Sequence, residues 1–190
     1  FLSPRSIGVW DQFRRNTITV YEENTDHSFR TSTQYPVGEN PTAILSGDYN
    51  GDGRNDLLVL LNGSGQNTAG GIAFLAGRGD GTFDASVFKE LPGNPYKMAQ
   101  SDLNGDGRLD LVVVPSGFNT GARVYLGGPN VTFTDGGAVT NSNATAVTIA
   151  DMDGDTRADL LLGPSHGKLG FLQGAGAGKF QATVELSVPG

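Results

Sequence analysis

One nine-residue pattern occurs three times in this chain, and each copy runs directly into a short apolar segment. The copies begin at Asp48, Asp102 and Asp151, and Asp or Asn occupies positions 1, 3, 5 and 9 of every copy. The segments that follow, residues 57–61, 111–114 and 160–162, are rich in Leu and Val, which predicts buried strands. A pattern that recurs at intervals of about 40–50 residues is typical of repeat architectures, so the chain should fold as a stack of similar units.

The spacing of these oxygen-bearing side chains predicts a Ca²⁺ site in each copy. Ca²⁺ takes roughly six to eight oxygen ligands, which a short loop can supply from alternate side chains and a backbone carbonyl. The candidate ligands are the side chains at positions 1, 3, 5 and 9 and the carbonyl oxygen of position 7. They are Asp48, Asn50, Asp52, Arg54 and Asp56 in the first loop, Asp102, Asn104, Asp106, Arg108 and Asp110 in the second, and Asp151, Asp153, Asp155, Arg157 and Asp159 in the third.

Two other interpretations of the loops are weaker. An EF-hand needs a bidentate Glu at position 12 and a following helix, but position 12 is Val59, Val113 and Leu162. Metal-free Asx turns between strands would explain a single copy of the pattern. They explain less well why Asp or Asn occupies positions 1, 3, 5 and 9 in all three copies. The third loop departs from the other two because Thr156 replaces a glycine, and a β-branched residue is unfavourable where φ is positive.

The charge of the chain agrees with three cation sites. The loops hold three, three and four aspartates, which is half of the 20 acidic residues. Three Ca²⁺ ions would therefore bring the formal net charge from −7 to −1. A chain that is acidic and lacks a basic cluster is not expected to bind nucleic acid, and no apolar run approaches the ~18 residues of a membrane span.

The sequence of each repeat unit predicts four strands and almost no helix. In the clearest unit the strands are expected at about 42–47, 56–62, 72–77 and 83–91, with the calcium loop between the first two. The complete units span about 42–91, 97–140 and 145–188, and residues 1–37 supply a partial unit that lacks a calcium loop. The chain is therefore predicted to be a single all-β region, a β-propeller or part of one, built of four-stranded blades.

The strand, the DxNGDGRxDL segment and the next apolar strand together resemble the FG-GAP or VCBS repeats of integrin α-subunit propellers. The resemblance covers roughly residues 16–188, and the calcium loops are its specific part. It implies a propeller in which structural calcium holds the blades rigid for binding at another surface. Four units are few for such a ring, so the chain could be part of a longer propeller, half of a homodimeric ring or a four-bladed closure. A first residue that is Phe1 suggests a mature or excised piece.

The resemblance implies a calcium-stabilised extracellular binding module, without catalytic activity, whose partner is a carbohydrate or a cell-surface protein. The alternatives are an accessory propeller domain of a secreted polysaccharide-active enzyme and a structural spacer of a large surface protein. Loop calcium sites of modest affinity suit extracellular rather than cytosolic calcium. Arg78-Gly79-Asp80 matches a short adhesive tripeptide, but it is expected to be an ordinary exposed hairpin turn.

Overall fold

The fold consists almost entirely of antiparallel strands. The computed structural model describes residues 7–8, 16–23, 26–63, 70–91, 94–116, 121–139, 144–165, 168–181 and 184–187. Within these ranges the one helical element is a 3₁₀ turn at Pro129–Val131, so the all-β expectation is confirmed. No helix of the described residues has the length and apolar character needed to cross a membrane.

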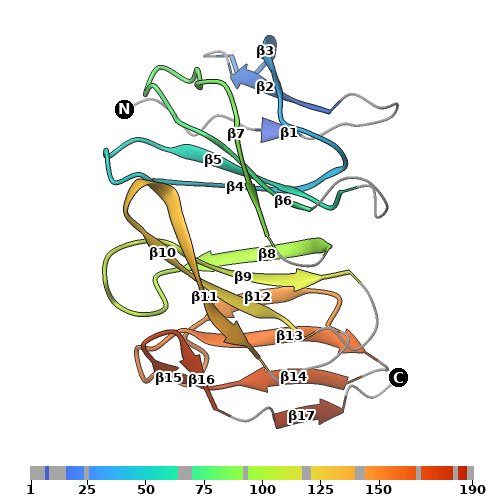
Figure 1. The fold of residues 1–190 in the computed structure, drawn as a ribbon, viewed down its shortest axis with the longest axis vertical. Helices are drawn as coiled ribbons and strands as arrows, with labels where there is room; N and C mark the ends of the chain where they lie inside the picture. The colour runs from blue at the N-terminus through green and yellow to red at the C-terminus, as the bar shows by residue number, and fades with distance from the viewer. Residues whose placement is uncertain are drawn as a thin grey trace.

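Four main sheets follow one another along the long axis of the molecule (Figure 1). Sheet 1 contains β1 (Ile7–Gly8), β2 (Thr17–Glu23) and β3 (Phe29–Pro36). Sheet 2 contains β4 (Pro41–Gly47), β5 (Asp56–Leu61), β6 (Gly71–Leu75) and β7 (Val87–Glu90). Sheet 3 contains β8 (Pro95–Ser101), β9 (Asp110–Pro115), β10 (Arg123–Gly128) and β11 (Thr132–Ala138). Sheet 4 contains β12 (Val147–Ala150), β13 (Asp159–Ser165), β14 (Lys168–Leu172) and β17 (Val184–Ser187).

Sheets 2, 3 and 4 share one design, in which consecutive strands pair antiparallel. The loop that joins the first two strands is the nine-residue pattern in each case, and the three loops lie on the same side of the molecule, at the left of Figure 1. Sheet 4 carries an additional two-stranded hairpin, β15 (Gly174–Gly176) with β16 (Lys179–Phe180). The described residues of sheet 1 form three strands, and part of residues 1–37 lies outside the described ranges.

One strand is shorter than predicted. The fourth strand of sheet 2 was expected to begin at residue 83, but β7 begins at Val87. Phe83 forms only an isolated bridge to Gly77. The reason is the tight turn that precedes it, in which the Asp80 carboxylate accepts hydrogen bonds from both the backbone and the hydroxyl of Thr82.

The second strand of each unit is buried on both of its faces. All six residues of β5 are buried, and successive side chains of a strand point to opposite faces of its sheet. Leu57 and Val59 therefore pack in a cluster with residues of sheet 1, whereas Leu58 and Leu60 pack in a cluster with residues of sheet 3. This two-sided burial explains why the sequence there is continuously apolar and does not alternate.

Removal of one side chain from an inter-sheet cluster tests this packing. Leu58 is fully buried between sheets 2 and 3, so Leu58→Ala is expected to lower the free energy of unfolding by about 2–5 kcal/mol in a urea titration. Val87 lies on the exposed edge of sheet 2, and Val87→Ala should change the free energy of unfolding by no more than about 0.5 kcal/mol. Equal effects of the two substitutions would contradict the proposed packing.

Candidate metal centres

The first aspartate of each loop organises the loop backbone. In the first loop, Asp48 Oδ1 accepts hydrogen bonds from the N–H groups of Gly51 at 2.7 Å and Asp52 at 3.0 Å. Asp48 Oδ2 accepts a further bond from the N–H of Gly53 at 2.8 Å. One carboxylate therefore gathers three consecutive loop amides, which closes the chain into a tight turn around its own side chain.

The same geometry recurs in the other two loops. In the second loop, Asp102 accepts hydrogen bonds from the N–H groups of Gly105 at 2.7 Å and Gly107 at 2.8 Å. In the third loop, Asp151 accepts hydrogen bonds from the N–H groups of Gly154 at 2.7 Å and Thr156 at 2.9 Å. Position 6 has positive φ in every copy, with 80° at Gly53, 82° at Gly107 and 71° at Thr156. The third loop thus keeps the glycine conformation although it carries a β-branched residue, which confirms the strain that the sequence indicated.

The last aspartate of each loop is buried and joins three parts of its sheet. Asp110 is the first residue of β9, and its side chain has no exposed surface. Its Oδ2 accepts the N–H of Leu103 at 2.8 Å, at the start of the loop, and its Oδ1 accepts the N–H of Gly127 at 2.7 Å, near the end of β10. Asp56 accepts the equivalent pair of bonds from the N–H groups of Tyr49 at 3.0 Å and Gly77 at 2.8 Å. Asp159 accepts them from the N–H groups of Met152 and Gly174, both at 2.8 Å.

Three glycines are required by this arrangement. A Cβ atom at Gly77 would lie 1.9 Å from the carbonyl oxygen of Asn55, the residue before the buried aspartate. At Gly127 it would lie 2.3 Å from the carbonyl oxygen of Leu109, and at Gly174 2.5 Å from that of Ala158. Only a residue without a side chain lets the third strand approach closely enough to donate to the buried carboxylate.

Burial makes the charge of these aspartates costly. Burial raises the pKa of Asp56 and of Asp110 above the ordinary value of an aspartate, while the backbone N–H donors act in the opposite direction. Neighbouring loop carboxylates raise the pKa of both aspartates further. Asp52 acts on Asp56, and Asp106 and Asp102 act on Asp110. A cation between the carboxylates would offset both of these costs.

The donor set fits a hard cation best in the third loop. One carboxylate oxygen each of Asp151, Asp153 and Asp159 lies within 4.8 Å of the other two, so the three could hold a metal ion. In the first and second loops Asn replaces the aspartate at position 3, and the Asn50 and Asn104 amides donate to Asp52 at 3.1 Å and to Asp106 at 3.2 Å. Positions 3 and 5 are therefore adjacent in these loops as well.

The arginine at position 7 has a side-chain contact in each loop. The guanidinium groups of Arg54, Arg108 and Arg157 lie 3.9, 3.8 and 3.5 Å from the position 5 carboxylates of Asp52, Asp106 and Asp155. These pairs are solvent-exposed and contribute little to stability. A ligand role stays a prediction for the three arginine carbonyl oxygens and for the aspartate and asparagine side chains of all three loops.

The structure also brings in residues that the sequence pattern did not indicate. The Gln173 amide donates a hydrogen bond to Asp153 Oδ2 of the third loop. The side chain at position 2 is buried in the first two loops, where the Tyr49 hydroxyl donates to Gln100 Oε1 of β8 and Leu103 packs between sheets 3 and 4. Burial and the charge of Asp56 raise the pKa of Tyr49 well above its usual range, so this hydroxyl keeps its proton.

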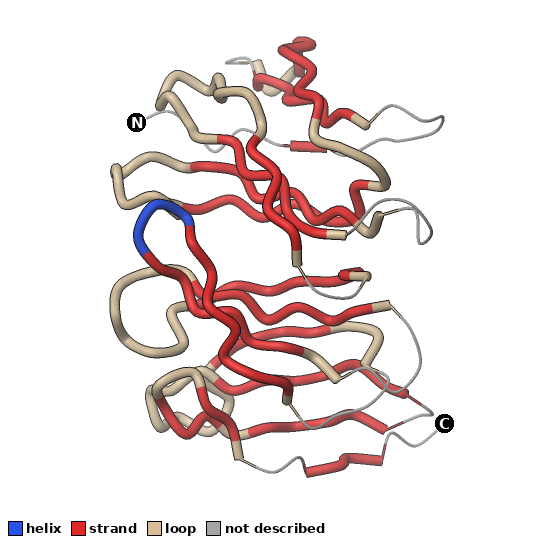
Figure 2. Tube along the Cα trace, viewed as in Figure 1, coloured by secondary structure: helices blue, strands red, loops and turns tan. Residues whose placement is uncertain are grey.

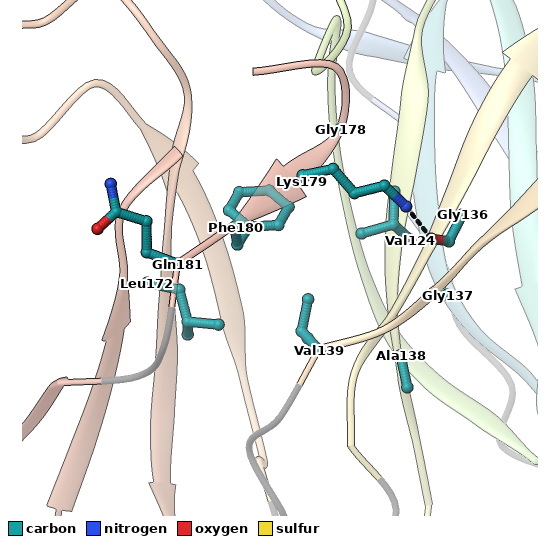
Figure 3. A pocket seen from close by; sticks show the side chains of 10 residues that line it. All are labelled: Val124, Gly136, Gly137, Ala138, Val139, Leu172, Gly178, Lys179, Phe180 and Gln181. Carbon is teal, nitrogen blue, oxygen red and sulfur yellow. Dashed lines mark hydrogen bonds between the residues drawn. The ribbon is translucent and has the colours of Figure 1, made fainter. Parts of the chain in front are cut away.

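Two small cavities lie where sheet 4 meets sheet 3. The first, of about 210 Å³, lies between the second and third loops, and its lining includes Asp102, Asn104, Arg157, Lys179 and Phe180. The second, of about 130 Å³, lies between β11 and the β15–β16 hairpin (Figure 3). In that cavity Lys179 Nζ donates to the carbonyl oxygen of Gly136 at 2.9 Å, which ties the hairpin to sheet 3.

The turn at residues 78–80 is exposed, as predicted. The Arg78 guanidinium pairs with Asp84 at 2.5 Å, and the Asp80 carboxylate caps Thr82 with bonds of 2.8 and 2.6 Å. Both charged side chains of the tripeptide thus take part in the structure of their own hairpin.

Repeated four-stranded antiparallel sheets of this kind are consistent with the blades of a β-propeller. A family model described as FG-GAP-like repeat matches residues 8–59 and 102–162, which is more than half of the chain. The chain therefore belongs to the family of FG-GAP-like repeat proteins, whose repeats often bind calcium.

Several solved structures are similar to this chain. A chain of the Tc holotoxin pore of Photorhabdus luminescens, solved in a mutant form, is similar at 19% identity and a TM-score of 0.49. The alignment covers 96% of the present chain but only 9% of that chain, so the present chain spans a small part of its length. No curated protein matches the sequence.

Relief of the strained position in the third loop should stabilise the protein. Thr156→Gly is expected to raise the free energy of unfolding by about 1 kcal/mol in a urea titration, because glycine adopts positive φ without steric cost. The reverse change in the second loop, Gly107→Thr, is the matched control, since a Cβ atom there would meet no neighbour within 4 Å. It should destabilise by a similar amount, and a loss of stability in Thr156→Gly would contradict the argument.

Proposed function

We propose that this chain is a calcium-stabilised, non-catalytic binding module that acts outside the cell. Its partner is a carbohydrate or a cell-surface protein, and carbohydrate is the ligand that the cavity between the second and third loops favours. The observation that carries the proposal is the repeated loop, in which the first and last aspartates have the same backbone donors in every copy.

Structural calcium is supported by the way these carboxylates are held. Both oxygens of Asp48 and of Asp102 accept backbone amides, which fixes the position of these carboxylates within their loops. The close carboxylates of Asp151, Asp153 and Asp159 support the same role for the third loop. An ion held in this way would fix the connection between the first two strands of its sheet. Calcium sites of modest affinity suit extracellular rather than cytosolic calcium concentrations.

A binding role for the cavity is supported by its chemistry. Its lining residues include a carboxylate, an amide and a guanidinium side chain together with Phe180, and such groups can hydrogen-bond hydroxyls and stack on a sugar face. Its volume of about 210 Å³ is below the roughly 300–1,000 Å³ of sites for drug-sized ligands, which suits a single sugar residue. Asp102 and Asn104 are also candidate ligands of the second loop, so calcium and sugar binding should be coupled.

Removal of calcium tests the metal proposal. Each site occupied at a hundredfold excess over its Kd would contribute about 2.7 kcal/mol, which corresponds to roughly 5–10 °C in Tm for a chain of this size. Chelation with EGTA should therefore lower the Tm measured by calorimetry by many degrees, and calcium should restore it. Sodium chloride at matched ionic strength is the control, and a melting temperature that chelation leaves unchanged would refute structural calcium.

Binding to a panel of immobilised glycans, measured with and without calcium, tests the ligand proposal. Arg157→Ala should weaken the binding of a recognised glycan by at least about tenfold, or 1.4 kcal/mol, because it removes a donor from the cavity. Arg54→Ala, at the same position of the first loop, is the matched control and should leave the affinity unchanged. Absence of glycan binding in saturating calcium, or equal loss in the two variants, would contradict carbohydrate recognition at this cavity.

A further inference from the structure

The third loop carries one more carboxylate than the other two. Its position 3 is Asp153, whereas the first and second loops have Asn50 and Asn104 there. Each asparagine makes two bonds to the aspartate at position 5. Its Oδ1 accepts the backbone N–H of that aspartate at 2.8 Å in both loops. Its side-chain amide donates to the carboxylate at 3.1 Å in the first loop and 3.2 Å in the second, which offsets the negative charge there.

Asp153 can reproduce only one of these two bonds. Its Oδ1 accepts the N–H of Asp155 at 3.1 Å, as the asparagine oxygens do in the other loops. Its Oδ2 stands in place of the asparagine amide nitrogen, and an ionised carboxylate has no hydrogen to donate. Repulsion between the carboxylates of Asp153 and Asp155 would therefore favour rotation of the exposed Asp153 side chain out of the loop.

Gln173 supplies the missing donor from outside the loop. Its side-chain Nε2 donates a hydrogen bond to Asp153 Oδ2. Gln173 follows β14 directly, and the next residue, Gly174, donates its backbone N–H to Asp159 Oδ1 at 2.8 Å. Two consecutive residues thus contact two of the three carboxylates whose oxygens lie within 4.8 Å of one another in this loop.

The backbone of Gln173 is anchored on both sides. Its carbonyl oxygen accepts the N–H of Gln181 at 2.9 Å across the base of the β15–β16 hairpin, and Gly174 is bound to the buried Asp159. The side chain therefore projects from a fixed point, and only its own rotamers need to be ordered when the amide meets Asp153.

The other two units keep this backbone but lack the amide side chain. The residue before the equivalent glycine is Ala76 in the first unit and Leu126 in the second. The Ala76 carbonyl oxygen accepts the N–H of Asp84 at 2.8 Å, which is the same anchor as in the third unit. The side-chain amide thus lies within the loop in two units, and at Gln173 in the unit whose loop has an aspartate at position 3.

We propose that Gln173 positions Asp153 for a cation in the third loop and thereby raises the affinity of this loop for Ca²⁺. The inference rests on the structural calcium proposed above. A greater number of charged ligands favours tighter Ca²⁺ binding, and Gln173 allows the loop to hold its fourth carboxylate in place. Residues that orient a metal ligand without touching the metal typically change metal affinity by about 10–100-fold.

Binding at the third loop can be measured separately from the other two. Terbium(III) binds oxygen ligands as Ca²⁺ does and emits when a nearby tryptophan is excited. Met152 lies within the third loop and is 40% exposed, so Met152→Trp places a sensitiser there. The unsubstituted chain, which contains Trp10, gives the baseline. Displacement of terbium by Ca²⁺ then reports the Ca²⁺ affinity of this loop.

In the Met152→Trp chain, Gln173→Met removes the donor and keeps a side chain of similar length. It should lower the Ca²⁺ affinity of the third loop by at least about tenfold. With Asp153→Asn also present, the new amide can donate to Asp155, so Gln173→Met should change the affinity by less than about twofold. The Tm of Gln173→Met in EGTA should stay within about 4 °C of the parent, because the bond it loses is a single one outside the core.

Two failures of this experiment are distinguishable. Equal Ca²⁺ affinity with and without Gln173→Met, or the same loss when residue 153 is asparagine, would refute the role of Gln173 and leave structural calcium intact. Absence of terbium and Ca²⁺ binding in the Met152→Trp chain itself would refute calcium in this loop, and the role of Gln173 with it.

Transfer of the pair to the first loop tests the same role without changing Gln173. Tyr49 is the one aromatic residue of the three loop sequences and can sensitise terbium in the first loop. With Asn50→Asp present, Ala76→Gln should raise the Ca²⁺ affinity of this loop by at least about tenfold. With Asn50 retained, Ala76→Gln is the matched control and should change the affinity by less than about twofold. No gain in the Asn50→Asp chain would overturn the proposal.

Discussion

The buried aspartate at the end of each loop is the interaction on which the rest of the repeat depends. It stands at the first residue of the second strand and accepts one amide from the loop and one from the end of the third strand. A carboxylate without exposed surface cannot exchange these donors for water, so loss of either bond would leave a buried polar group at a cost of about 1–3 kcal/mol. The loop, the second strand and the third strand are thus held in one register by a single side chain.

Much of this arrangement could be predicted from the sequence because it is encoded locally. The candidate ligands lie within nine residues, and the strands that follow are continuous apolar runs. The two-sided burial of residues 57–61 follows from that continuity. The strained position at Thr156 could also be recognised, because the neighbouring copies carry glycine there.

Other features depend on contacts between distant segments and left no regular signal. Gly77, Gly127 and Gly174 follow their aspartates at different distances in the sequence, because the connections between the second and third strands differ in length. Gln173 reaches the third loop only because β14 ends beside it. The contact of the β15–β16 hairpin with sheet 3 through Lys179 arises from the packing of two sheets.

The loops and the stacking of the sheets are physically connected. Tyr49 and Leu103 lie within loops whose backbones are shaped by carboxylates, yet their side chains fill the spaces between sheets. On the same side of the molecule, the turn at Pro129–Val131 extends from sheet 3 toward sheet 2, and Val131 packs in their shared cluster (Figure 2). Whatever orders a loop therefore also positions a side chain at an interface. Because linkage is reciprocal, if a cation in the loop strengthens the contact between sheets, a sheet that packs on the loop raises the affinity of the loop for the cation by the same factor.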